Sequence, residues 1–352
     1  MGPLTRPLGV AEAEEGGGPI ASARRVGQKQ SVSSSPAPTQ TTGLPSHSER
    51  RARLQADGAL ALITAFWGIT FVVVKGALSH GDPYSFLALR FGIGALALTA
   101  IARRELLVPD TLRRGLLLGV FLFLGFVLQT VGLVSTTPSR SAFITGLYVV
   151  LVPVLGLVLF RRVPRLSSWV GVVLAAVGMR YLTGAELDAG HGLSRGDWLT
   201  LGCALAYAFH ILLTERYAPK SSVVALVGVQ LWVVALLSAL CLPFAGARVD
   251  WTPSFVGAAA FCGLFASALA ICIQTWAQVR TTAVRVALIC SMEPVFAGVY
   301  SVALGYEKLG PREWVGGGLI VLGVLVAELG GHLWERMRAR TAPRLPDAPA
   351  SE

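Results

Sequence analysis

Two cationic side chains and a tryptophan interrupt the first apolar runs of this chain, and such residues suit solute binding. Trp67 and Lys75 lie in one run, "FWGITFVVVKGAL", and Arg90 lies well inside the next. A cation in hydrocarbon is costly unless it reaches the interface, a partner or water. Lys75 lies near the end of its run and can snorkel, whereas Arg90 is too deep to do so. We predict that Trp67 and Arg90 line a central path. Lys75 either contacts solute at a gate or serves as an interfacial anchor or structural ion pair.

Polar residues in later apolar runs extend this candidate path. Tyr207 and His210 lie about one helical turn apart. An imidazole changes its charge near physiological pH, so His210 is either a proton carrier or a hydrogen-bonded structural residue. Gln129 and Gln274 occupy similar sequence contexts. Buried amides of this kind either bind a polar ligand or join helices.

Glu293 is a candidate proton or cation site. It lies in "CSMEPVFAG", immediately before Pro294. The proline ring and its missing N–H favour a break in the helix, and an intramembrane acid beside a break is typical of ion-coupling sites. The competing interpretation is a structural ion pair with Arg285 or Arg90.

No catalytic or metal-binding pattern accompanies these residues. The sequence lacks H-E-x-x-H, G-x-S-x-G and Walker motifs, so we expect neither an enzyme nor a cofactor nor a metal site. The cysteines lie in apolar runs without C-x-x-C spacing and are predicted to be free packing thiols. The predicted substrate contacts are Trp67, Lys75, Arg90, Gln129, Tyr148, Tyr207, His210 and Gln274, and the predicted ion-coupling residues are Glu293 and His210.

Composition indicates that membrane-spanning helices position these groups. The 352 residues are 53% hydrophobic and only 14% charged, which lies outside the usual range of soluble proteins. Apolar runs of about 18 to 24 residues recur, each long enough to cross a bilayer core as a helix. We predict an all-α polytopic membrane protein with ten transmembrane helices near 58–78, 84–101, 115–134, 141–160, 166–183, 198–217, 222–242, 255–279, 282–304 and 313–333.

The arginines predict the orientation of the chain. The net charge of +10 could suggest a nucleic-acid partner, but the arginines lie in short loops between apolar runs, as the positive-inside rule requires. This pattern predicts an inner (plasma) membrane protein with both termini in the cytoplasm. Residues 1–54 are rich in Gly, Ser and Pro and are expected to form a disordered cytoplasmic tail, and 334–352 form the C-terminal tail.

The chain also contains an internal repeat. "LQTVGLVSTTPSRSAFI" from Leu128 matches "IQTWAQVRTTAVRVALI" from Ile273 with a constant separation of 145 residues (274 − 129). This separation aligns Tyr148 with Glu293. It also gives the pairs Arg140 and Arg285, Gly171 and Gly316, and Gly178 and Gly323. Upstream, a separation of 140 residues (197 − 57) gives the pairs Asp57 and Asp197, Thr70 and His210, Lys75 and Glu215, and Arg90 and Gln230.

The repeat units are predicted to have opposite orientations in the membrane. Each unit, 55–184 and 196–333, contains five predicted spans. Because five is odd, the second unit enters the bilayer from the other side. Inverted repeats of this kind place a solute site near the membrane midplane.

Four segments in order resemble the two EamA domains of the drug/metabolite transporter superfamily. They are "WGITFVVVK", "TTPSRSAFITGLYVVLVP", "TTAVRVALICSMEPVFAG" and "LGYEKLGPREWVGGGLIVLGVL", and the resemblance extends from about residue 57 to 330. It implies a ten-helix secondary transporter, usually an exporter of amino acids, other metabolites or drugs. The first repeat has "FRRVP" where the second has Glu307 in "LGYEKL", so this acid has no counterpart.

These observations predict a secondary active exporter of small organic metabolites, amino acids or drugs that works by alternating access, with proton coupling as one option. Two alternatives remain open: a lipid or lipid-precursor flippase of the same fold, and a membrane sensor or scaffold that transports nothing. The expected partners are a small-molecule solute and the lipid bilayer, with a homodimer left open and no nucleic acid.

Overall fold

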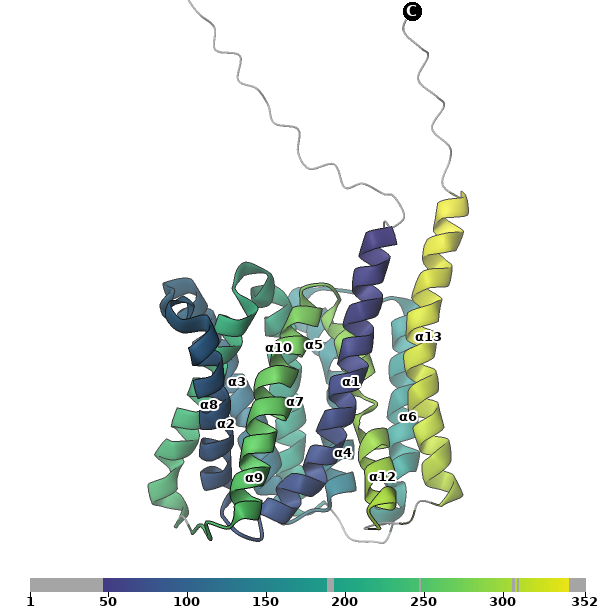
Figure 1. Ribbon diagram of the computed structural model, residues 1–352. Coiled ribbons are helices and arrows are strands. Elements are labelled where there is room, and N and C mark those ends of the chain that lie inside the picture. The colour runs from purple at the N-terminus through teal and green to yellow at the C-terminus, as the bar shows by residue number, and fades with distance from the viewer. Residues whose placement is uncertain (1–46, 189–192, 247, 306–307, 309, 342–352) are drawn as a thin grey trace, which may run out of the picture. The chain divides into compact units, whose positions relative to one another are not determined.

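The described part of the chain consists of helices joined by short connections (Figure 1). The structure is a computed structural model that describes residues 47–188, 193–246, 248–305, 308 and 310–341. Predictions for residues 1–46, 342–352 and Glu307 lie outside this part. Within it, β structure is limited to one isolated bridge between Gly81 and Val249.

The predicted spans correspond to helices with similar bounds. In the first half these are α1 (His47–Ala77), α2 (Pro83–Ala102), α3 (Pro109–Val134), α4 (Pro138–Gly146), α5 (Tyr148–Phe160) and α6 (Leu166–Asp188). In the second half they are α7 (Arg195–Tyr217), α8 (Val223–Ala245), α9 (Pro253–Phe261), η3 (Cys262–Leu269), α10 (Ala270–Gln278), α11 (Ala283–Cys290), α12 (Glu293–Ala303) and α13 (Pro311–Thr341). α1 begins within the predicted N-terminal tail, and α13 extends into the predicted C-terminal tail. Two short 3₁₀ turns, η1 (Arg103–Leu107) and η2 (Ala218–Lys220), complete the described elements.

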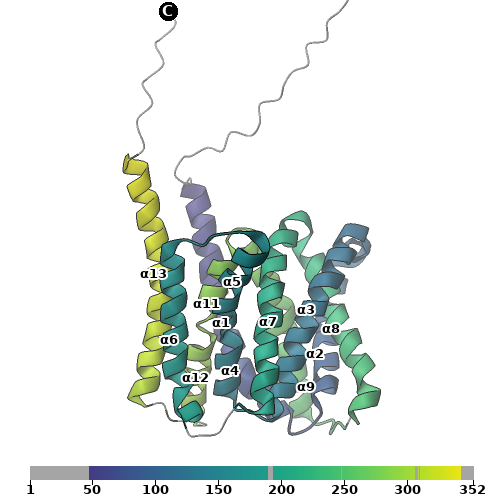
Figure 2. The same cartoon turned by 180° about the vertical axis from the view of Figure 1, so that it is seen from behind.

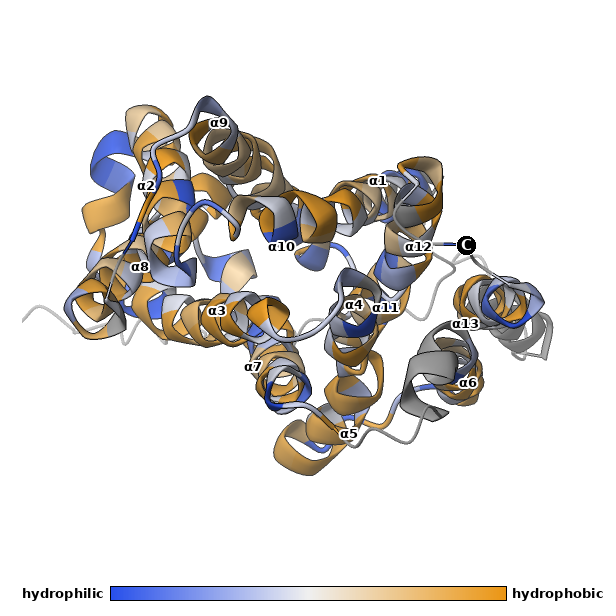
Figure 3. Cartoon of the chain, turned by 90° about the horizontal axis from the view of Figure 1, so that it is seen from below, coloured by the Kyte–Doolittle hydropathy of each residue, from blue (hydrophilic) through white to orange (hydrophobic). Residues whose placement is uncertain are grey.

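Eight helical stretches in the described residues are long and apolar enough to cross a bilayer, and α6 adds a shorter apolar stretch, Leu166–Tyr181. Apolar residues predominate in the helices seen from below (Figure 3). Large apolar side chains such as Leu96, Val158 and Leu236 are exposed, which suits contact with lipid chains. The chain is therefore an all-α polytopic membrane protein.

Two predicted spans are interrupted at aligned positions. Gly146 ends α4 and Tyr148 begins α5, while Cys290 ends α11 and Glu293 begins α12. The second break precedes Pro294, which lies in the first turn of α12, where a missing N–H costs no helical hydrogen bond. Pro153 lies inside α5 without ending it. Tyr148 and Glu293 each therefore begin a half-helix inside the bundle.

The segment η3 between α9 and α10 is π-helical. Short π-helical segments change the direction in which side chains and carbonyl groups point and occur often at functional sites. η3 packs closely against α2: a Cβ at Gly263 would clash with the Arg90 carbonyl oxygen, and one at Gly94 would lie 2.7 Å from the Gly263 carbonyl oxygen. The absence of side chains lets the two backbones approach.

Helices from the two halves pack in pairs. α2 lies against α8, α3 against α7, and α6 against α13, as Figure 2 also shows for the last pair. A Cβ at Gly171 would lie 2.6 Å from the Gly323 carbonyl oxygen, and one at Gly178 would lie 2.6 Å from the Gly316 carbonyl oxygen. These glycines therefore allow the backbones of α6 and α13 to approach closely.

Candidate solute site

A central cavity of about 60 Å³ lies between helices of both halves. Seven of the eight predicted substrate contacts line it, and so does the predicted ion-coupling residue Glu293. The described lining residues are Trp67, Thr70, Arg90, Leu122, Phe126, Gln129, Tyr148, Tyr207, His210, Ile211, Ile271, Gln274, Cys290 and Glu293. The cavity is much smaller than typical ligand pockets of about 300–1,000 Å³. A metabolite would fit only after the helices around it move apart.

Arg90 presents a buried guanidinium to this cavity. Only 2% of the residue is exposed. Its Nε donates to Ser267 Oγ at 2.8 Å, and its Cζ lies 5.1 Å and 4.8 Å from the ring centroids of Phe91 and Phe126. In the described part of the chain, Arg90 has no ion-pair partner and its terminal nitrogens make no hydrogen bond. The guanidinium is therefore held in place by groups that leave its two terminal nitrogens available to a ligand.

The π-helical segment positions both Arg90 and Trp67. Ser267, which accepts from Arg90, lies in η3, and Trp67 Nε1 donates to the carbonyl oxygen of Ala266 in the same segment at 2.8 Å. Two neighbouring residues of η3 thus fix two cavity-lining side chains from α1 and α2. The indole and the guanidinium are therefore both anchored to η3.

His210 lines the cavity and is also held by a hydrogen bond. Its Nε2 lies 2.7 Å from Gln230 Oε1 on α8. The Gln230 amide nitrogen donates to the Leu226 carbonyl oxygen at 3.1 Å, so the amide oxygen is the acceptor and His210 Nε2 is the donor. The hydrogen bond from Nε2 to Gln230 agrees with a structural role for His210. The same side chain also lines the central cavity.

Glu293 begins half-helix α12 and is 7% exposed. The positive end of a helix dipole favours an anion at this position. Among the described residues, neither proposed structural partner forms an ion pair with Glu293: Arg285 pairs with Asp57, and Arg90 Nε donates to Ser267 Oγ. Within the described residues, the Glu293 carboxyl group makes no hydrogen bond or ion pair.

The two glutamines occupy comparable positions but have different contacts. Gln129 Nε2 donates to Thr145 Oγ1 at 3.1 Å. Gln274 is 6% exposed, and its amide makes no hydrogen bond among the described residues. The amides therefore do not join α3 to α10 directly. Gln274 keeps its donors and its acceptor available to a bound solute.

Lys75 does not line the central cavity. Its Nζ donates to the carbonyl oxygens of Leu133, Val134 and Thr136 at 2.6, 3.2 and 3.1 Å. These carbonyl groups belong to the C-terminal end of α3 and the connection to α4. The ammonium thus caps a helix whose last carbonyls have no intrahelical partner.

The lining residues that sequence reasoning did not predict are mostly apolar: Thr70, Leu122, Phe126, Ile211, Ile271 and Cys290. Thr70 lies one turn from Trp67 on the same helical face, so helical periodicity could have identified it. The apolar residues carry no comparable signal. Cys290 is one of five cysteines that are all free, as predicted.

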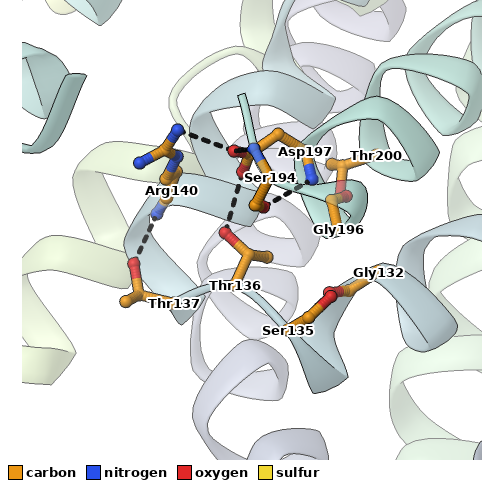
Figure 4. A network of polar contacts seen from close by, with 9 residues as sticks. All are labelled: Gly132, Ser135, Thr136, Thr137, Arg140, Ser194, Gly196, Asp197 and Thr200. Atoms are coloured by element: carbon orange, nitrogen blue, oxygen red, sulfur yellow. Dashed lines mark hydrogen bonds and ion pairs between the residues drawn. The ribbon is translucent and has the colours of Figure 1, made fainter. Parts of the chain in front are cut away.

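An ion-pair network joins the two halves at the connection between α3 and α4 (Figure 4). Arg140 Nη2 lies 2.6 Å from Asp197 Oδ2, and Thr136 Oγ1 donates to Asp197 Oδ1 at 3.0 Å. Asp197 also accepts from the Ser194 backbone nitrogen, while the Ser194 hydroxyl caps α7. Asp197 therefore joins α4, α7 and the connection between α3 and α4.

Comparisons with known proteins agree with this structure. The model of the EamA-like transporter family matches residues 56–184 and 194–329. An uncharacterized transporter of Archaeoglobus fulgidus is 34% identical over 79% of this chain and 87% of its own. The uncharacterized inner membrane transporter YedA of Escherichia coli is 25% identical over 85% of this chain and 98% of its own.

Two further comparisons bear on fold and relatives. A probable amino-acid metabolite efflux pump of Salmonella typhimurium is 31% identical over 49% of this chain and 58% of its own. A protein crystal structure that is 20% identical aligns with a TM-score of 0.67 over 81% of this chain and 99% of its own, which shows a shared fold. With both of its halves matched by the family model, the chain belongs to the EamA-like transporter family of the drug/metabolite transporter type.

Proposed function

We propose that this protein is a secondary active transporter that exports small organic metabolites by alternating access. The observation that carries this proposal is the central cavity, which both halves of the chain line with polar groups held inside an apolar bundle. Polar groups inside a membrane protein typically mark a solute or ion pathway. The small volume of the cavity fits a contracted state from which the halves separate to admit solute.

The substrate class is a small zwitterion, such as an amino acid. Arg90 offers a guanidinium that can bind a carboxylate through two parallel hydrogen bonds. Glu293 offers a carboxyl group that can bind an ammonium, and both groups lack an ionic partner among the described residues. The name of the Salmonella relative, a probable amino-acid metabolite efflux pump, supports this class.

Glu293 is the proposed proton-coupling residue. An ionised carboxylate without a counter-ion is costly in a buried site, so this group binds either a proton or a cationic part of the solute. Mutually exclusive binding of a proton and an ammonium would exchange inward proton movement for outward solute movement. His210 Nε2 already donates a hydrogen bond to Gln230 Oε1. We therefore assign the coupling role to Glu293 rather than to His210.

The proposed architecture is ten membrane helices in two inverted repeats. A two-fold relation requires that if one residue contacts a second, the counterpart of the second contacts the counterpart of the first. The glycine contacts obey this rule: Gly171 meets Gly323, and their counterparts Gly316 and Gly178 meet each other. The aligned breaks before Tyr148 and Glu293 provide independent support.

The proposed orientation places both termini in the cytoplasm. α1 begins and α13 ends at the same end of the bundle (Figure 1). Arg53, near the start of α1, lines one cavity together with Arg165 and Arg280, and basic residues are concentrated on the cytoplasmic side of membrane proteins.

An untargeted metabolite comparison tests the proposed export function. Cells that overproduce the protein should release at least one zwitterionic metabolite faster than deletion cells. Cells that overproduce the Arg90→Ala variant should match the deletion cells. Release that is the same in all three strains at equal membrane abundance would contradict export.

A further inference from the structure

A second and larger cavity, of about 570 Å³, is separate from the central one. We call it the arginine cavity, because the charged residues among its described lining residues are five arginines and one acid, Glu215. The arginines are Arg53, Arg162, Arg165, Arg280 and Arg285. They come from α1, from the connection between α5 and α6, and from the connection between α10 and α11 together with α11 itself. Three distant segments thus bring positive charge to one cavity.

Acids within the described residues neutralise only part of this charge. Arg162 pairs with Glu215, and Arg285 Nη2 lies 2.6 Å from Asp57 Oδ2. Arg53 makes no hydrogen bond or ion pair in the described part of the chain. The positive-inside rule explains basic loops, but it does not require arginines from three segments to converge on one cavity.

Arg280 is held in a fixed position beside the cavity. Its Cζ lies 4.2 Å from the Trp276 ring centroid, and its Nη1 donates to the Trp276 carbonyl oxygen at 2.8 Å. Among the described residues, Arg280 has these contacts with a carbonyl and an aromatic ring but no carboxylate partner. A guanidinium fixed on an aromatic ring keeps further donors available for an anion.

The rest of the cavity wall combines hydroxyl groups with apolar side chains. Thr281 and Ser168 supply hydroxyl groups, and Val163, Leu212 and Leu288 supply apolar surface. The N-terminal end of α11 contributes little to anion binding, because the Ala283 N–H already donates to Glu215 at 3.2 Å. The arginines therefore supply the positive charge that would bind an anion.

We propose that the arginine cavity binds a phosphate group, carried either by an anionic lipid or by a free phosphate-bearing molecule. Arginine is the side chain best suited to phosphate, because its planar fork can donate two parallel hydrogen bonds to phosphate oxygens. The apolar part of the wall can receive the start of an acyl chain. This inference does not depend on which solute the central cavity transports.

The arginine cavity comes within one helical turn of the central cavity. Gln274 lines the central cavity, and Gln278, four residues later on α10, lines the arginine cavity. Gln278 Nε2 donates to the Ile211 carbonyl oxygen at 2.8 Å, and Ile211 itself lines the central cavity. A phosphate group bound beside α10 is therefore placed to affect the wall of the central cavity.

Binding can be measured on the purified full-length protein after delipidation. Isothermal titration calorimetry with inorganic phosphate tests a free ligand, and native mass spectrometry after reconstitution with mixed phosphatidylglycerol and phosphatidylcholine tests a lipid headgroup. The test variant combines Arg53→Gln and Arg280→Gln, because neither side chain pairs with an acid among the described residues. The matched control is Arg104→Gln, an exposed arginine outside the cavity.

The wild type and Arg104→Gln should bind at least one probe equally, and the double variant should bind it at least about tenfold more weakly, since a charge-assisted hydrogen bond is worth about 1.5–3 kcal/mol. Calorimetric binding of phosphate would identify a free ligand. Retention of phosphatidylglycerol over phosphatidylcholine, without phosphate binding, would identify a headgroup. Failure of both probes to bind the wild type, or equal binding by all three proteins, would overturn the proposal.

Discussion

Arg140 on α4 forms a 2.6 Å ion pair with Asp197 on α7, and the same bond recurs between their counterparts in the repeat. Arg285 on α11 pairs with Asp57 on α1, also at 2.6 Å. In each pair the arginine belongs to one half of the chain and the aspartate to the other. Each bond thus fastens the start of a broken span to the first helix of the opposite half.

The two pairs should differ in their contribution to stability. The side chains of Arg140 and Asp197 are 11% and 0% exposed, against 19% and 16% for Arg285 and Asp57. Leaving one partner of a buried pair uncompensated costs about 3–5 kcal/mol. Arg140→Gln should therefore lower the thermal unfolding midpoint in detergent more than Arg285→Gln does. Equal midpoints for the two variants would show that burial does not determine how much each ion pair contributes to stability.

Arg90 should be indispensable for solute binding. Arg90→Ala should weaken binding of a zwitterionic solute by about 100-fold, because a carboxylate in the cavity would lose its ionic partner. Arg90→Lys should restore little, since an ammonium cannot form the two parallel hydrogen bonds. Arg104→Gln, in an exposed turn, serves as the control. Scintillation proximity binding to purified protein provides the measurement, and full affinity of the alanine variant would assign Arg90 to packing.

The sequence predicted the helical spans and most polar cavity residues for a physical reason. Buried polar groups such as Arg90 and Gln274 are costly in a membrane, so their presence in apolar runs indicates an interior site. The repeat separation then pairs Gln129 with Gln274 and Tyr148 with Glu293 as counterparts in the two halves. The cavity-lining Leu122 and Ile271 are apolar like the residues that face lipid, so their type carries no such indication.

Contacts between distant segments were not predictable from local patterns. Lys75 lies near the end of its span, as expected, but its ligands are carbonyl groups at the end of α3. Every residue has a backbone carbonyl group, so the residue types do not show which carbonyl groups accept a hydrogen bond from Lys75. The π-helical form of η3 has no local signature either, although it positions Ser267 against Arg90.

Lys75 should affect stability more than solute handling. Lys75→Gln should lower stability by about 1–3 kcal/mol, because helix-end carbonyls would lose a cationic donor. Transport per molecule should stay within about twofold of wild type, a change of under 0.5 kcal/mol. Quantitative immunoblotting measures the membrane abundance of each variant, and the measured flux is divided by that abundance. The control is Lys308→Gln, a substitution at an exposed lysine. Reduced flux per molecule at normal abundance would instead place Lys75 at a gate.

Reporter fusions can test the orientation of the repeats. Fusions after Arg165 and Lys220 should report the cytoplasm, and a fusion at Leu193 should report the outside. The reason is that the connection before α7 must lie opposite to both basic loops if each half contains five spans. A cytoplasmic signal from Leu193 would contradict the inverted repeat.

Glu293 should connect solute movement to protons. Glu293→Gln should raise the apparent transport constant for a zwitterion about tenfold or more, because a neutral amide replaces the ionic partner of the ammonium. The remaining flux should no longer respond to an imposed pH gradient. Glu105→Gln, at an exposed acid, controls for a general loss of charge. A variant that still accelerates with the gradient would exclude Glu293 as the coupling group.

The most direct measurement of transport uses purified protein in liposomes loaded with a panel of labelled amino acids and their N-acetyl and methyl-ester derivatives. Our proposal predicts that a proton gradient directed into the liposomes accelerates the efflux of at least one free zwitterion. The derivatives, which lack one of the two charges, should leave no faster than they leave protein-free liposomes, and Arg90→Ala should abolish the protein-dependent efflux of the zwitterion. If no compound leaves wild-type liposomes faster than protein-free liposomes, or if both derivatives leave as fast as the free zwitterion, the proposed central zwitterion site is wrong.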